Sequence, residues 1–197
     1  MRPAFVLALL LTACVDAGPR GPVEITEVDF TTIAGFHARD ATVLGVPMGA
    51  SREQAERIIE AHPDFVVHPD GANPGRFYVD FAQPASREEE SAFYFIWEPG
   101  HKGMNRVTVF RPAAALLRGE AKALLTTAAL DDAAAPAHKF LDELGERHVS
   151  LDIPAIRLRH TSHWFPRRGI EVTEQVDEAY GTRQVVFALI VRDEREH

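Results

Sequence analysis

Hydrophobic and polar residues follow regular spacings in a series of short segments along the chain. From Val23 to Phe30 the apolar positions have the spacing of a strand with a bulge or a bend. Residues 52–61 have the three- and four-residue spacing of an amphipathic helix, and Ser51 precedes them as a capping residue. Alternation then predicts strands at 77–81, 92–97 and 106–110, the last two forming a hairpin.

The second half of the chain has two helical segments and then three strands. Residues 113–130 are rich in Ala and Leu at helical spacing, with Gly119 as an interruption, and a second helix is expected at 137–146. Strands are expected at 156–160, 170–176 and 184–191. Because runs of strands are separated by runs of helices, we expect an α+β fold in which an antiparallel sheet packs against a few helices. Whether its halves are two weakly related repeats stays open.

Aromatic residues are concentrated in the predicted central strands. Strict alternation places Phe93, Phe95 and Trp97 on one face of a strand and Tyr94 and Ile96 on the other. One interpretation is a central strand covered by helices on one face and partly by the terminal segments on the other. The alternative is an exposed aromatic surface that binds a protein or a lipid-like ligand.

Composition and charge exclude some classes of protein. The 197 residues are 46% hydrophobic and 25% charged, which is typical of a folded chain. The net charge of −8 gives no general attraction to phosphate backbones, so nucleic acid is not an expected partner.

The N-terminal residues have the pattern of an export signal. Arg2 is followed by an apolar run from Ala4 to Leu11, too short to span a bilayer, and then by small residues. The sequence Leu11-Thr12-Ala13-Cys14 resembles the lipobox of bacterial lipoproteins. The resemblance implies that residues 1–13 are removed as a signal peptide and that Cys14, the only cysteine, becomes an acylated first residue carrying palmitate-type chains.

The same resemblance implies a location. Residues 14–22, rich in Gly, Pro and charge, form a flexible tether, and residues 23–197 form one domain, with sub-lobes 23–112 and 113–197 left open. The lipid anchor makes the membrane a partner, and the domain faces the periplasm of the cell envelope. Val15 after Cys14 favours the outer membrane over the inner membrane, although Asp16 follows it. Envelope proteins are the expected partners.

A second resemblance covers residues 44–110. The stretch LGVPMGASREQAERII carries Gly49, Ser51, Glu53, Ala55, Ile58 and Ile59 in the pattern of the SmpA/OmlA outer-membrane assembly lipoproteins and the β-lactamase inhibitor-like domains. It differs from them at Ala50 and in the segment after the helix. The resemblance implies helices packed on a sheet, and an envelope binding or assembly module without catalysis.

Catalytic motifs are absent from the sequence. It has no G-x-S-x-G elbow, no P-loop and no G-x-G-x-x-G, and its only thiol lies in the lipobox. His160 and His163 form a weak metal pattern that needs a turn between them, since residues three apart on a strand face opposite sides. We therefore predict no catalytic, cofactor or metal residues, and a noncatalytic binding or scaffold lipoprotein. The alternatives are a metal-assisted hydrolase using those histidines, or a periplasmic carrier of a small ligand or lipid.

Overall fold

The computed structural model describes residues 21–83, 91–127, 130, 136–152 and 158–192. Cys14 and residues 15–20 of the predicted tether lie outside these residues. The described part combines a few helices with antiparallel sheet, so the predicted α+β class is confirmed. The helices are α1 (Arg52–Glu60), α2 (Gly119–Thr126) and α3 (Pro136–Leu144), with short 3₁₀ turns at Phe30–Thr32, Ala38–Asp40 and Arg111–Ala115. Among the described helices, none has the length and apolar character that crossing a bilayer requires.

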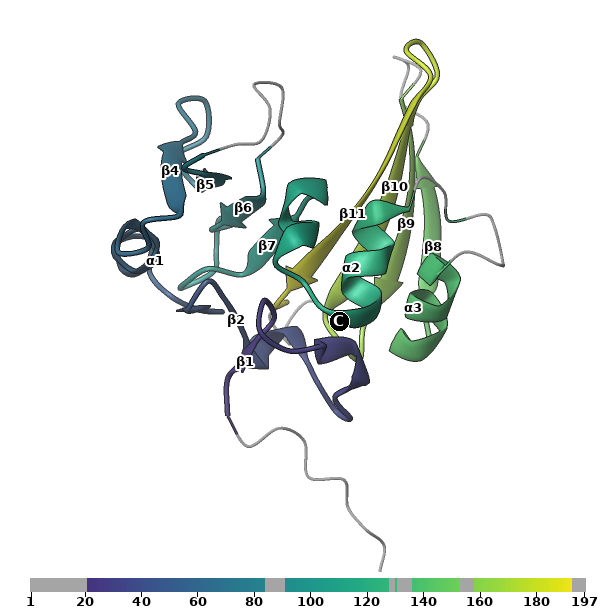
Figure 1. The fold of residues 1–197 in the computed structure, drawn as a ribbon, viewed down its shortest axis with the longest axis horizontal. Coiled ribbons are helices and arrows are strands. Elements are labelled where there is room, and N and C mark those ends of the chain that lie inside the picture. The colour runs from purple at the N-terminus through teal and green to yellow at the C-terminus, as the bar shows by residue number, and fades with distance from the viewer. Residues whose placement is uncertain (1–20, 84–90, 128–129, 131–135, 153–157, 193–197) are drawn as a thin grey trace, which may run out of the picture.

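One large antiparallel sheet dominates the fold (Figure 1). Its strands lie in the order β4-β5-β6-β7-β11-β10-β9-β8. Their bounds are β4 Phe65–Pro69, β5 Arg76–Phe81, β6 Phe93–Ile96, β7 Arg106–Val109, β8 His148–Asp152, β9 Leu158–Phe165, β10 Ile170–Asp177 and β11 Thr182–Ile190. A smaller sheet joins β1 (Val23–Glu24), β2 (Ala41–Val43) and β3 (Val46–Pro47), in which β1 and β2 run parallel.

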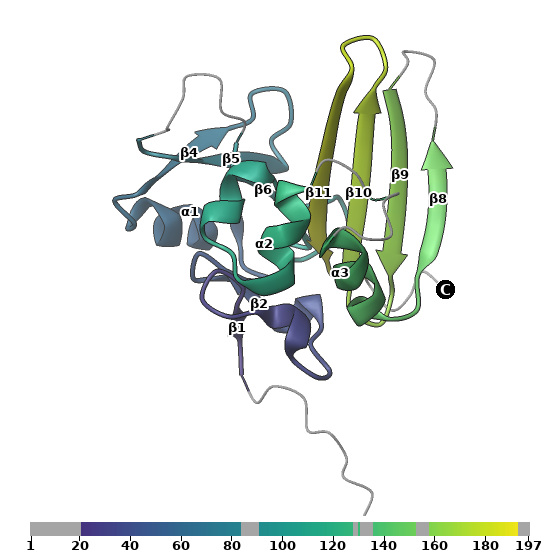
Figure 2. The ribbon, with the colours of Figure 1, turned by 45° about the vertical axis from the view of Figure 1, so that its right-hand side comes forward.

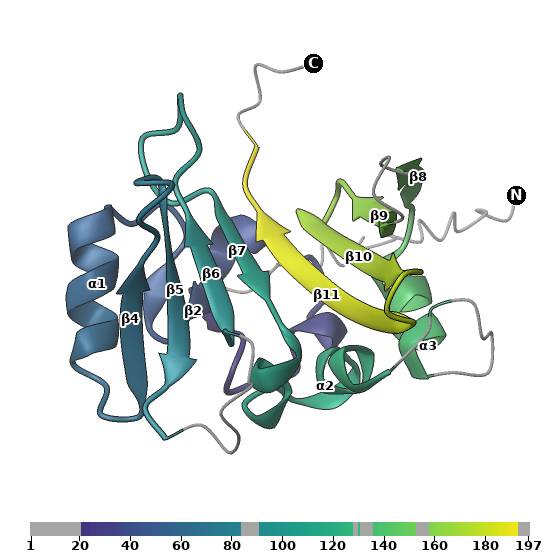
Figure 3. The same cartoon turned by 90° about the horizontal axis from the view of Figure 1, so that it is seen from above.

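The pairing of β7 with β11 joins the strands β4–β7 to the strands β8–β11. Phe187 of β11 lies opposite Val109 of β7, so strands from 23–112 and from 113–197 form one continuous sheet. The strands turn progressively along this sheet, and β8 and β9 lie at a steep angle to β4 and β5 when viewed from above (Figure 3).

Helices and the N-terminal segment cover one face of the sheet. The ring of Phe187 lies 5.9 Å from that of Phe30 and 6.3 Å from that of Phe140 in α3. At the other end of the sheet, Arg52 of α1 lies over the ring of Phe77. Helices α2 and α3 pack against each other over β11 and its neighbours (Figure 2). The buried core lies between these elements and this sheet face.

The observed helices and strands agree with the predicted ones where the local sequence pattern is strong. Helix α1 covers the predicted 52–61 almost completely, and the Ser51 hydroxyl accepts the backbone N–H of Gln54 at 3.2 Å. The hairpin of β6 and β7 and the strands β5, β10 and β11 are confirmed. The first two residues of the strand predicted at 156–160 lie outside the described residues, and the other three belong to β9, which begins at Leu158.

Two predicted elements are wrong. Instead of one bent strand, the segment Val23–Phe30 contains the two-residue β1, a turn and the start of a 3₁₀ helix. In the turn, the Glu24 carboxylate accepts the N–H of Thr26 at 3.2 Å, and this local bond diverts the chain. The predicted helix 113–130 begins as a 3₁₀ turn, and α2 starts only at Gly119, which has a φ of +52°. The strand β8 was not predicted from the sequence.

Candidate functional site

The face of the large sheet opposite the helices combines aromatic and charged residues, and we call it the mixed face. This face is formed because successive residues of a strand point to opposite sides of the sheet. Tyr94 therefore lies on the face opposite to the one that contains the buried Phe93 and Phe95. The predicted division of this strand into two faces is therefore confirmed. The main residues of the mixed face are Arg76, Tyr78 and Asp80 of β5, Tyr94 of β6, Arg106 of β7, Trp164 of β9 and Glu171 of β10.

A row of aromatic rings crosses the first half of this face. Tyr78 and Tyr94 are cross-strand neighbours with ring centroids 4.6 Å apart, and the Phe110 ring lies 4.6 Å from that of Tyr94. All three side chains are half-buried. Adjacent rings at this spacing form a stable, partly exposed apolar surface.

Charged groups surround the aromatic row. Arg76 Nε donates to the carboxylate of Asp70, and this bond, together with weaker ones from Ala72 and Tyr78, holds the pKa of Asp70 below its usual value. His68 Nε2 lies 3.3 Å from Asp80 Oδ2. Because the Asp70 carboxylate is ionised and already paired, it is suited to positioning Arg76 and Tyr78 and unsuited to donating a proton.

Long side chains cover the part of the mixed face formed by β7, β11, β10 and β9. Arg106 Nη2 donates to Glu171 Oε2 at 2.9 Å, reaching from β7 to β10 across the small residue Ala188 of β11. Arg192 lies over the Trp164 ring, 4.2 Å from its centroid. These neighbours account for the burial of Ala188 and Ile190 on a face that no described helix covers.

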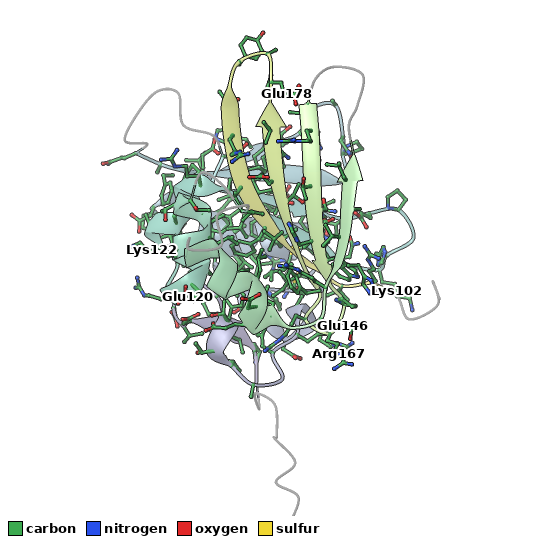
Figure 4. All side chains as sticks on the ribbon, turned by 90° about the vertical axis from the view of Figure 1, so that its right-hand side faces the viewer. Lys102, Glu120, Lys122, Glu146, Arg167 and Glu178 are labelled. Carbon is green, nitrogen blue, oxygen red and sulfur yellow. The ribbon has the colours of Figure 1, made fainter. Side chains whose placement is uncertain are left out.

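A basic hollow lies at the end of β7 and β11. It has a volume of about 180 Å³ and is lined by Arg39, Met48, Gly49, His101, Lys102, Gly103, Met104, Asn105 and Val191. Arg39 and Lys102 are exposed and His101 is half-buried, so the groups at the rim are basic. Lys102 lies on the side of the molecule away from Glu120 and Lys122 of α2 (Figure 4). A small anion is the ligand that such a rim would attract.

The histidines weighed as metal ligands are separated by the sheet. His160 and His163 both lie within the uninterrupted strand β9, so no turn brings them to the same side. Among the described residues, no three His, Cys, Asp or Glu side chains gather closely enough to hold a metal ion. The metal-assisted hydrolase therefore lacks the geometry that it needs at this pair.

Sequence reasoning placed Tyr94 correctly but missed the residues around it. The pairs His68–Asp80 and Arg106–Glu171 join different strands, so they depend on the strand register. The pair Asp70–Arg76 joins the start of the β4–β5 turn to the start of β5. The hollow is lined by residues from four separate stretches of the chain, 39, 48–49, 101–105 and 191. Comparisons with known proteins find no matching family model, no matching curated protein and no matching solved structure.

Proposed function

We propose that this chain is a lipid-anchored, noncatalytic protein of the bacterial cell envelope, and that its mixed face binds a partner protein. The observation that carries the proposal is the row Tyr78–Tyr94–Phe110, half-exposed on the sheet face that no described helix covers. Rings flanked by ion pairs are typical of protein interfaces, where an apolar centre lies within a polar rim.

The anchor in this proposal is Cys14, in the lipobox-like sequence Leu11-Thr12-Ala13-Cys14. Two or three acyl chains hold a protein on a bilayer stably, whereas a single chain holds it only marginally. We expect Cys14→Ser to abolish labelling by a palmitate analogue and to release the protein from membranes. Retention of both the label and the membrane association in the variant would contradict the anchor.

Binding through the mixed face is tested by site-specific photocrosslinking in cells. A photoreactive phenylalanine analogue at Tyr94 should give one discrete adduct of defined mass. The matched control is the same analogue at Tyr180, which is 83% exposed in the turn between β10 and β11 and lies outside the aromatic row. A Tyr78→Ala substitution should weaken the adduct at Tyr94. Equal labelling at both positions, or an adduct insensitive to Tyr78→Ala, would contradict the proposal.

A second candidate function is the carriage of a small anionic ligand, and the basic hollow is the observation that favours it. Inorganic phosphate and acetate are suitable probes, added to the full chain and followed by calorimetry. Lys102→Ala should weaken binding several-fold, whereas Lys122→Ala, on α2 and outside the hollow, should leave it unchanged. Equal loss in both variants would show only a general effect of charge.

A further inference from the structure

The strand β8 forms one edge of the large sheet. It spans His148–Asp152 with the sequence HVSLD, and among the described strands it pairs only with β9 (Figures 2 and 4). The pairing with β9 is regular, with one residue opposite one from His148↔Trp164 to Asp152↔His160. The backbone groups on its other side are therefore arranged as a straight edge that another strand can join.

This edge lacks three of the features that usually prevent strand addition. It contains no proline, no lysine and no bulge in its register with β9. Val149 and Leu151 are both 58% exposed and, being two residues apart, lie on the same face of the sheet. The opposite edge differs, because β4 ends in Pro69, which has no N–H to donate, and α1 packs beside it.

The sequence of β8 is complementary to itself when read in the antiparallel direction. If two copies pair about a two-fold axis through Ser150, Val149 of one copy lies opposite Leu151 of the other. The same register places His148 opposite Asp152. A shift by one residue loses both matches, and a shift by two residues keeps a single apolar pair, Val149 with Val149 or Leu151 with Leu151. Self-complementarity of this kind is the condition for a closed two-fold dimer.

We propose that β8 pairs with β8 of a second copy of this chain, centred on Ser150, and that the two large sheets join into one sheet across the dimer. Main-chain hydrogen bonds supply the attraction, and the paired Val149 and Leu151 side chains set the register. This interface is separate from the mixed-face row and from the hollow, so it holds whether or not the proposed function is correct.

Cysteine crosslinking in the full-length chain tests the register. At the two-fold axis the Cα atoms of the two Ser150 residues are about 4.5–5.5 Å apart, within the range that a disulfide spans. Two copies of His148 are separated by about 13 Å along the strands. Under mild oxidation, Ser150→Cys should give at least tenfold more disulfide-linked dimer than His148→Cys.

Two controls accompany this experiment. The unsubstituted chain shows what Cys14 contributes by itself, and Val66→Cys, 41% exposed on β4, shows the yield from random collision at the other edge. Similar yields at Ser150, His148 and Val66, or no dimer with Ser150→Cys, would overturn the proposal.

A second pair of variants tests the apolar contacts without a thiol. Val149→Lys combined with Leu151→Lys places lysines opposite one another in the proposed dimer and should at least halve the sedimenting dimer fraction. Both side chains are exposed, so the variant should keep its circular dichroism spectrum and melting temperature. Val66→Lys is the matched control and should leave the dimer fraction unchanged. A dimer that survives the double substitution would overturn the proposal.

Discussion

Gly103 lies so close to Gly49 that a Cβ atom at residue 103 would overlap the Gly49 carbonyl group. The same two segments are tied by backbone hydrogen bonds of 2.8 Å from Gly49 to Met104 and from Met104 to Ala50. The connection between β6 and β7 is thus held against the connection between β3 and α1, and this contact forms one wall of the basic hollow.

This contact predicts a large effect from adding one methyl group. Gly103→Ala must push the two backbones apart, and overpacking of this kind destabilises a protein by about 1–3 kcal/mol. Gly71→Ala is the matched control, because no atom lies within 4 Å of its added Cβ and its φ is not positive. Urea unfolding should show a lower midpoint for Gly103→Ala alone. Equal midpoints for both variants would contradict the close contact.

Trp97 predicts a second stability effect beside that wall. Its Nε1 donates to the Ala50 carbonyl oxygen at 2.9 Å, and its ring lies 5.2 Å from the ring of Phe77. Trp97→Phe leaves the carbonyl without this donor and removes part of the packing, at an expected cost of about 1–3 kcal/mol. Trp164→Phe, on the mixed face, should cost less because it removes only a partly exposed contact with Arg192. Unfolding followed by circular dichroism measures both, and the reverse order would contradict the assignment.

Asp70 predicts a dependence of stability on acid. The hydrogen bond from Arg76 lowers the pKa of Asp70 in the folded chain below 3.8, so the folded state binds this proton less readily than the unfolded state does. The stabilisation is therefore complete above the unfolded pKa and is lost as the pH falls through the folded pKa. Asp70→Asn should lower stability at pH 7 and flatten the loss below about pH 4. Parallel urea-midpoint curves for the two proteins would contradict this role.

His37 predicts a separate effect at milder pH. Its Nδ1 accepts the backbone N–H of Arg39 at 3.1 Å, and burial, followed by the Arg39 charge, lowers its pKa below 6.5. The unfolded chain therefore takes up this proton first, and stability falls as the pH drops from about 7 toward 5. His37→Asn keeps an acceptor at the cap and removes the titration. The melting temperature of this variant should fall less than that of the unsubstituted chain over this pH range. An equal fall in the two proteins would contradict the prediction.

The elements that could be predicted from sequence are those with local causes. Helix α1 begins after Ser51 because the capping hydroxyl lies three residues before the N–H that it accepts. The hairpin of β6 and β7 was indicated by alternating residues on both sides of a Gly-containing loop. The error at Val23–Phe30 has a distant contribution, because the Glu24 carboxylate also accepts the N–H groups of Leu44 and Gly45, at 3.1 and 2.8 Å. No local pattern indicates a bond across twenty residues.

The candidate site was less predictable for the same reason. The alternation of β6 indicated that Tyr94 points away from the core, but its neighbours Tyr78 and Phe110 follow from the register between strands. The strand β8 was missed because an edge strand with two exposed faces carries little hydrophobic signal. Arg39 and Lys102 line the same hollow although they are far apart in the sequence, and the hydrogen bonds of Gly49 and Ala50 with Met104 hold the walls of this hollow together.

The position of β11 has a consequence for how the chain acquires this fold. It is the last described strand in the sequence, yet it lies between β7 and β10 in the middle of the sheet. While the chain is being synthesised, β7 and β10 each have one edge that will later pair with β11. These two edges stay exposed until residues 182–190 have emerged. The large sheet is therefore completed only after residues 182–190 have been released, and a product truncated before Thr182 lacks the strand that joins β7 to β10.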